Sequence, residues 1–182
     1  MRTLFSIVLI FLFTFNCFSQ SKASDQINDE YYGLKWGCSI KELISKYPAA
    51  YAQGSNDDGD ELYYLETNGV TRIFFFGNGK LYMGRVVYSD CSNEKILALM
   101  SKVVEKYGKF DSSEKGSAQG SEYLSCIRDY SSIIKIECQV VSLKNSYGYN
   151  ISQAVFINYV NKNLLAKIAK ERIHKMQGDL EL

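Results

Sequence analysis

Residues 61–88 read ELYYLETNGVTRIFFFGNGKLYMGRVVY, and the turn residues within this segment set the arrangement of the strands. Asn68-Gly69 divides it once, and Gly77-Asn78-Gly79 divides it again. Asn-Gly between two apolar runs is the strongest short signal for a β-hairpin, because both residues tolerate the positive φ angles of a two-residue turn. The spacing therefore predicts three antiparallel strands over residues 61–67, 70–76 and 80–88.

A second set of strands follows further along the chain. Strands are predicted over residues 121–130 and 133–143, on either side of Ser131-Ser132. From Ile134 to Val140, apolar and polar residues alternate, which is the period of a strand with one buried face. Residues 145–148 turn the chain, and a last strand ends at Tyr159.

Helix signals flank both sets of strands. Ser39 and Glu42 form a capping-box pattern, and Pro48 ends the first helix. A second helix begins within residues 90–93 and has Gly108 as its C-cap. Asn161 caps a third, C-terminal helix that extends to residue 177. Residues 53–60 and 109–120 are polar and rich in Gly and Ser, so they are predicted to be a loop and a flexible connector.

The order of these elements predicts an α+β domain over residues 31–182, built from two helix–three-strand units. The two pseudo-repeats cover about residues 31–89 and 90–160. Both helices follow a Cys-Ser pair and end in a Lys-Tyr pair, Lys46-Tyr47 and Lys106-Tyr107. We expect one antiparallel sheet of about six strands with helices on one face, and an extra C-terminal helix over residues 161–177.

The opening of the domain carries a short structural motif. Residues 33–43 read GLKWGCSIKEL. This run resembles the opening of small exported bacterial proteins of unknown function, which begin G-x-x-W-G-x-S-x-x-E; here the motif residues include Trp36, Gly37, Ser39 and Glu42. The helix-plus-meander repeat is also similar in architecture to the β-lactamase-inhibitor-protein fold. Neither resemblance implies a catalytic residue, and we expect Trp36 to be a packing residue that closes one end of the core.

The N-terminus reads as an export signal. Leu4 to Phe15 is apolar apart from Ser6 and Thr14. As a helix it would rise about 18 Å, too short for a bilayer core of ~30 Å. Residues 1–19 are therefore predicted to be a cleaved signal peptide, followed by a flexible segment over residues 20–30 and by no transmembrane helix. The protein would be periplasmic or extracellular; the alternative is a lipoprotein anchored through Cys17.

Composition and motifs exclude several chemistries. Formal net charge is +1 over 182 residues, which argues against a nucleic-acid binder. The one histidine, His174, has no recognisable catalytic partner, and we predict no catalytic, cofactor or metal-binding residue. The acidic run from Asn56 to Glu61 has alternating oxygens that suit Ca²⁺, but it lacks the EF-hand spacing, so a solvated acidic loop is favoured.

Four cysteines remain after the predicted cleavage. Cys126 and Cys138 lie at nearly equal distances from the Ser131-Ser132 turn, so a hairpin there would place them opposite each other. Two interpretations are left open: a disulfide between Cys126 and Cys138, or two small buried thiols that act as ordinary core residues. A pairing of Cys38 with Cys91 ranks second.

Tyrosines suggest a function. Nine of them fall on or beside predicted strands: Tyr63, Tyr64, Tyr82, Tyr88, Tyr123, Tyr130, Tyr147, Tyr149 and Tyr159. An exposed tyrosine-bearing sheet face suits binding of a glycan or of another envelope or secreted protein. The sequence thus predicts a non-catalytic binding module with no cofactor. The alternatives are a small protein inhibitor and a secreted hydrolase that uses Asp and Glu carboxylates.

Overall fold

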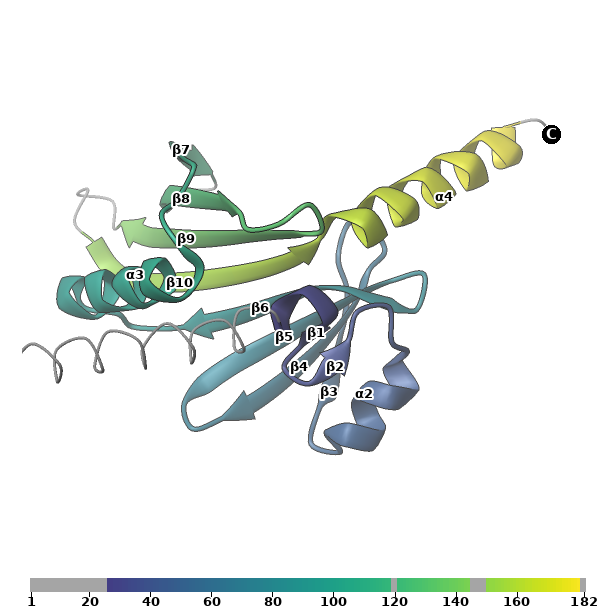
Figure 1. Ribbon diagram of the computed structural model, residues 1–182, viewed down its shortest axis with the longest axis horizontal. Helices are drawn as coiled ribbons and strands as arrows, with labels where there is room; N and C mark the ends of the chain where they lie inside the picture. Colours follow the sequence, from purple (N-terminus) through teal and green to yellow (C-terminus); the bar gives the residue numbers. More distant parts are fainter. Residues whose placement is uncertain (1–25, 119–120, 145–149, 181–182) are drawn as a thin grey trace, which may run out of the picture.

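A computed structural model describes residues 26–118, 121–144 and 150–180, and its centre is one antiparallel sheet (Figure 1). The eight strands are β3 (Tyr51–Ser55), β4 (Glu61–Thr67), β5 (Val70–Gly77), β6 (Lys80–Tyr88), β7 (Ser112–Ala118), β8 (Ser121–Asp129), β9 (Ile134–Lys144) and β10 (Asn150–Asn161). Their order is β3-β4-β5-β6-β10-β9-β8-β7. Two four-stranded meanders therefore meet through their last strands, β6 and β10.

The expected number of about six strands is wrong, because each unit contains a fourth strand. The added strands, β3 and β7, lie within or beside the segments predicted to be a loop and a connector. Both are edge strands. All five residues of β3 are exposed, so the segment buries no face and shows no alternation of apolar and polar residues. Polar edge strands also avoid pairing with other chains.

The helices begin where their caps predict; the first two also end there, whereas the C-terminal helix extends to Leu180, beyond the expected end at residue 177. Ser39 and Glu42 form the capping box of α2 (Ile40–Lys46). Ser92 caps α3 (Asn93–Tyr107), and Gly108 is its C-cap with a φ of 90°. For α4 (Lys162–Leu180), the Asn161 side-chain oxygen accepts a hydrogen bond from the Leu164 amide at 3.0 Å.

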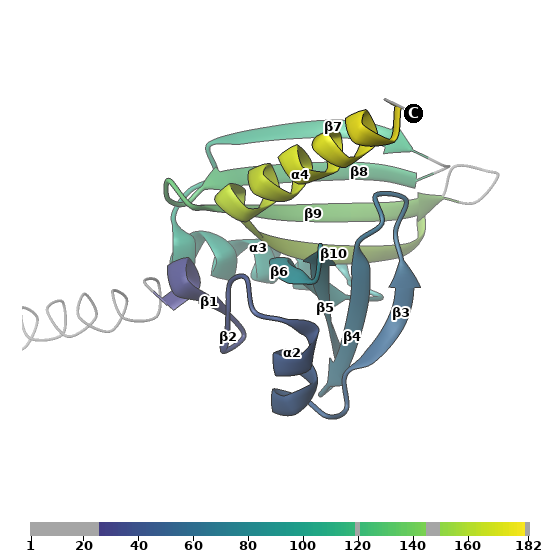
Figure 2. The same cartoon turned by 90° about the vertical axis from the view of Figure 1, so that its right-hand side faces the viewer.

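Helices lie on both faces of the sheet. α2 and α3 pack with the main core on one face of the sheet, named the helix-covered face. Ile168 of α4 packs against Ile73 and Phe75 on the opposite face. Figures 1 and 2 both place α4 on the side of the molecule away from α2. The expectation of helices on one face therefore holds for the two repeat helices alone. The run Ile73–Phe76 is apolar at every position, a pattern typical of a strand covered on both faces.

The start of the domain, from residue 26, is an ordered segment on the helix-covered face. The expectation that the chain is flexible up to residue 30 is therefore wrong for residues 26–30. Residues 26–29 are helical, and β1 (Glu30–Tyr31) pairs with β2 (Leu34–Lys35). Ile27 is buried, and its carbonyl accepts a hydrogen bond from the Trp36 indole at 2.9 Å. The predicted signal peptide, Cys17, residues 20–25 and the predicted turn over residues 145–148 lie outside the described residues.

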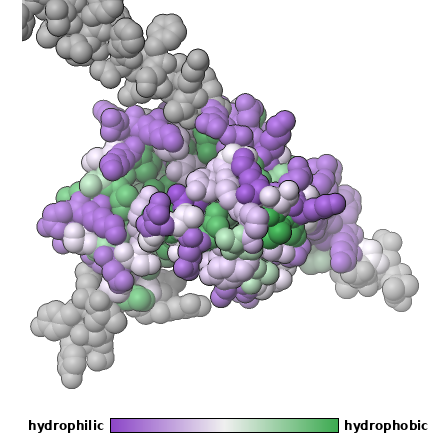
Figure 3. All heavy atoms as spheres, turned by 90° about the horizontal axis from the view of Figure 1, so that it is seen from below, coloured by the Kyte–Doolittle hydropathy of each residue, from purple (hydrophilic) through white to green (hydrophobic). Residues whose placement is uncertain are grey.

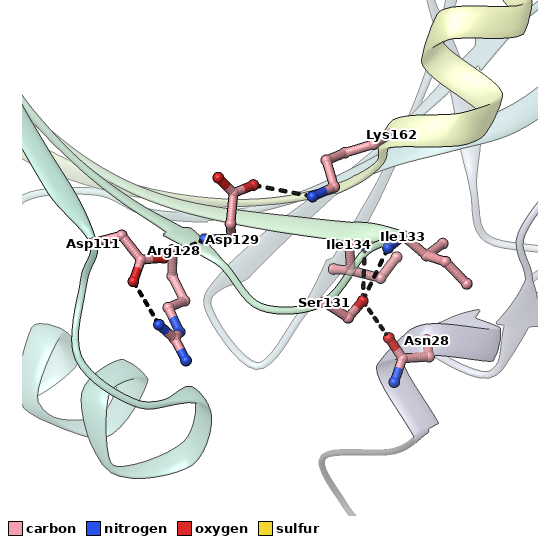
Figure 4. Close-up of polar contacts among 8 residues, drawn as sticks. All are labelled: Asn28, Asp111, Arg128, Asp129, Ser131, Ile133, Ile134 and Lys162. Atoms are coloured by element: carbon pink, nitrogen blue, oxygen red, sulfur yellow. Dashed lines mark hydrogen bonds and ion pairs between the residues drawn. The ribbon is translucent and has the colours of Figure 1, made fainter.

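The β8–β9 turn holds this segment in place (Figure 4). Ser131 donates its hydroxyl hydrogen to the Asn28 side-chain oxygen at 2.8 Å. The same hydroxyl oxygen accepts the Ile134 amide at 3.0 Å. Nearby, Lys162 at the start of α4 pairs with Asp129 at 3.1 Å. One turn of the second unit thus fixes both the N-terminal segment and α4.

Candidate functional site

A pocket with a volume of about 630 Å³ lies on the helix-covered face, between the N-terminal segment and the C-terminal ends of α2 and α3. This volume is in the range of small-molecule sites. Five tyrosines line it: Tyr31, Tyr32, Tyr47, Tyr107 and Tyr159. Viewed from the side on which α2 lies in Figure 1, the surface has apolar patches among hydrophilic side chains (Figure 3).

Tyr31 supports the pocket from beneath because β6 has a glycine under its ring. A Cβ on Gly84 would lie 2.2 Å from a ring carbon of Tyr31, so the ring rests directly on the backbone. The Tyr31 hydroxyl donates to the Arg85 carbonyl at 3.1 Å. Its ring lies 5.5 Å from those of Phe74 and Tyr159. Burial raises the pKa of Tyr31 and of Tyr159 well above the usual phenol range.

Tyr32 forms the rim in a strained conformation. Its φ is 49°, in the left-handed region. The other described non-glycine residues with positive φ are Asn68, Asn78 and Asp90, which are residue types that tolerate this region; a bulky tyrosine does not. The ring stacks on Tyr47 at 5.2 Å, and the Tyr47 hydroxyl donates to the Tyr32 carbonyl at 2.6 Å. Backbone strain of this kind clusters at ligand sites.

Two cations face the pocket. The Arg72 guanidinium carbon lies 4.2 Å from the centre of the Tyr32 ring, and Arg72 Nη1 donates to the Thr67 hydroxyl at 2.5 Å. Lys106 Nζ lies 5.0 Å from the centre of the Tyr107 ring. Within the described part of the chain, neither cation lies in an ion pair. Glu30 is the one described carboxylate residue that lines the pocket.

The two Lys-Tyr pairs of the pseudo-repeats converge on this site. Tyr47 and Tyr107 end α2 and α3, and both line the pocket. Each neighbouring lysine lies over its tyrosine ring, at 5.9 Å for Lys46 and 5.0 Å for Lys106. The sequence repeat was therefore a signal for the site. It pointed to helix ends rather than to the open sheet face. Of the nine strand tyrosines, Tyr147 and Tyr149 lie outside the described residues, and of the seven described ones only Tyr159 lines this pocket.

The four motif residues support the site from outside it. Trp36 packs against the core, its ring stacked on Tyr31 at 6.0 Å. Gly37 adopts a φ of 81° and donates its amide to the Leu81 carbonyl at 2.8 Å. Ser39 and Glu42 cap α2, and hydrogen bonds from Ser39 lower the pKa of the Glu42 carboxyl. None of the four lines the pocket.

The acidic run is not a solvated loop throughout, because Asp60 is fully buried. Its carboxylate accepts hydrogen bonds from Tyr82 at 2.7 Å and from Asn56 at 2.9 Å, and it pairs with Arg172 of α4. His174 lies exposed on α4. Over residues 26–118, 121–144 and 150–180, no group of three His, Cys, Asp or Glu is placed to hold a metal ion. No helix in these ranges is long and apolar enough to cross a bilayer.

Cys126 and Cys138 are directly opposite each other in the β8–β9 register, as the hairpin centre predicts. The disulfide itself is not formed: both are buried free thiols, as are Cys38 and Cys91. Burial raises the pKa of the Cys138 thiol to about 12 and that of Cys38 to about 11. Thiolate, the reactive form, is therefore scarce at neutral pH in the folded protein.

Stability should fall at alkaline pH because of the buried phenols. Desolvation raises the pKa of Tyr31, and desolvation with the Asp60 hydrogen bond raises that of Tyr82. Phenols of the unfolded chain ionise near pH 10, so above about pH 10 the unfolded state loses protons that the folded state retains. The contribution of these phenols to the free energy of unfolding should be constant below that pH and decrease above it. Urea unfolding measured at a series of pH values below and above pH 10 should show this decrease, and Tyr31→Phe should make the decrease smaller.

Comparison with known proteins adds no identification. No family model, curated protein or solved structure matches the chain.

Proposed function

We propose that this protein is an exported, non-catalytic binding module of the cell envelope, and that its ligand binds in the tyrosine-lined pocket. The observation that carries the proposal is Tyr32. A strained, exposed tyrosine at a pocket rim costs conformational free energy, which a purely structural turn would avoid by using Asn or Gly. Such strain is consistent with selection for binding.

The composition of the pocket supports binding rather than hydrolysis. Glycoside hydrolases use two carboxyl groups about 5–9.5 Å apart on either side of the bond that is cleaved. Glu30 is the one described acidic side chain on this pocket, and its carboxylate accepts a hydrogen bond from Gln26. The ligand is a small molecule, a glycan end or a segment of a secreted or envelope protein.

Export is part of the proposal and has its own test. We expect the mature chain to start near Gln20, because the apolar run from Leu4 to Phe15 is short and has no charged stop signal. The intact mass of the exported protein measures this start. A diacylglyceryl adduct on Cys17 would instead support the lipoprotein alternative, and an uncleaved N-terminus would contradict both.

Tyr32→Asn tests the binding site without endangering the fold. The change creates Asn-Gly with Gly33, the preferred pair for a two-residue turn, so thermal stability should be kept or raised. It also removes the ring on which Arg72 lies. Ligand-observed NMR against a library of metabolites, saccharides and short peptides should find binders of the native protein that Tyr32→Asn no longer binds. Tyr51→Asn, an exposed tyrosine outside this pocket, is the control. Binders that are indifferent to Tyr32→Asn would contradict the proposed site.

A further inference from the structure

The position of Arg72 in the sheet points to the chemistry of the ligand. Cross-strand pairing places Arg72 in a row on the helix-covered face, between Leu65 of β4 and Val86 of β6. The row continues through Ile157, Cys138 and Cys126. Directly paired residues point to the same face. Arg72 is therefore the one charged side chain among these apolar neighbours.

A half-buried arginine in such a row needs a counter-charge. Placing a charge away from water is costly unless the charge is paired and hydrogen-bonded. Arg72 has two side-chain contacts, the Thr67 hydroxyl and the face of Tyr32, and both partners are neutral. The Tyr32 ring covers one face of the planar guanidinium group. The N–H groups at the edge of that group are left to bind a planar anion.

The second cation and the surrounding side chains restrict the anion. Arg72 and Lys106 against Glu30 leave the pocket with an excess of one positive charge. This excess matches a monoanionic carboxylate better than a phosphate dianion. Apart from Gln26, the remaining lining is apolar or aromatic, with Ile27, Tyr31 and Val86 among its members.

We infer that the pocket binds an organic monocarboxylate with an apolar or aromatic body, its carboxylate held at the edge of the Arg72 guanidinium. Lys106, which lines the same pocket, adds to the attraction of the anion. The body lies against the floor of the pocket. This inference rests on the proposed function, since it names the ligand class of the same site.

Matched pairs of probes test the carboxylate. The probes are 4-hydroxyphenylacetate and its neutral amide, with galacturonate as a polar acid and phenyl phosphate as a dianion. Trp36 is the only tryptophan, and it stacks on Tyr31 of the pocket, so its fluorescence reports binding; calorimetry provides a second readout. We expect 4-hydroxyphenylacetate to bind about tenfold or more tightly than the amide, and its affinity to fall with added salt.

Variants assign the preference to Arg72. Arg72→Gln should remove the difference in affinity between the acid and the amide. Arg72→Lys should retain part of this difference, because the positive charge remains although the planar guanidinium is lost. Lys106→Gln, a change at an exposed position, should weaken binding of the acid and leave binding of the amide unchanged. The matched control is Lys162→Gln, which also removes one positive charge but lies outside the pocket, where Lys162 pairs with Asp129. Circular dichroism verifies that each variant is folded.

The outcomes separate this inference from the proposed function. Equal affinities for acid and amide, tighter binding of galacturonate or of phenyl phosphate, or no effect of Arg72→Gln would each overturn the carboxylate assignment. Binding that is still abolished by Tyr32→Asn would leave the binding module intact. Failure of every carboxylate probe to bind would overturn the inference, whereas failure of the whole library would overturn the proposed function.

Discussion

Replacing Asp60 by alanine is expected to lower the free energy of unfolding by about 3–5 kcal/mol, the usual cost of breaking a buried ion pair by removing one partner. The Asp60 side chain is 1% exposed, and its partner Arg172 is 27% exposed. The substitution also leaves the Tyr82 hydroxyl and the Asn56 amide without their acceptor. Urea unfolding monitored by circular dichroism measures the loss.

The same substitution should release α4 from the sheet. Beyond Arg172, residues 173–178 are exposed, and the end of the helix extends away from the sheet in Figure 1. Hydrogen exchange in α4 should therefore accelerate more than exchange in β9. Asp129→Ala, which removes the solvent-exposed pair with Lys162, is the control and should cost far less. Equal losses of unfolding free energy in the two variants would show that burial of the Asp60–Arg172 pair adds nothing to stability.

Turn and cap chemistry made most of the fold predictable. Asn68-Gly69 and Gly77-Asn78-Gly79 gave strands β4 and β6 with their observed ends, because positive φ angles admit few residue types. Ser39 and Glu42 likewise gave the start of α2. Local backbone chemistry determines these features, so one sequence suffices to find them.

The edge strands and the candidate site were not predictable in the same way. β3 buries no side chain, so neither hydrophobicity nor periodicity identifies it. The pocket depends on contacts between distant parts of the chain: Arg72 and Tyr32 meet only after β1 packs on the sheet. The repeated Lys-Tyr pairs are visible in the sequence, but only the folded chain brings their two tyrosines to one cavity.

Gly84→Ala is expected to destabilise the protein by about 3 kcal/mol or more, although it adds only one methyl group. The new Cβ would lie 2.2–2.5 Å from three ring atoms of Tyr31, closer than real contacts allow. β6 is central in the sheet, between β5 and β10, so its backbone has little room to move. Tyr31 must therefore leave its position and lose its hydrogen bond to Arg85.

A double-mutant cycle with Tyr31 identifies the cause of this loss. In a Tyr31→Ala background the ring is gone, and Gly84→Ala should then be nearly neutral, or stabilising by up to about 1 kcal/mol through reduced freedom of the unfolded chain. Equal costs in the two backgrounds would show that the glycine is needed for another reason. Because Tyr31 forms part of the pocket lining, Gly84→Ala should also abolish ligand binding at temperatures where the variant is still folded. Gly178→Ala, which adds a methyl group in open space on α4, should leave binding unchanged.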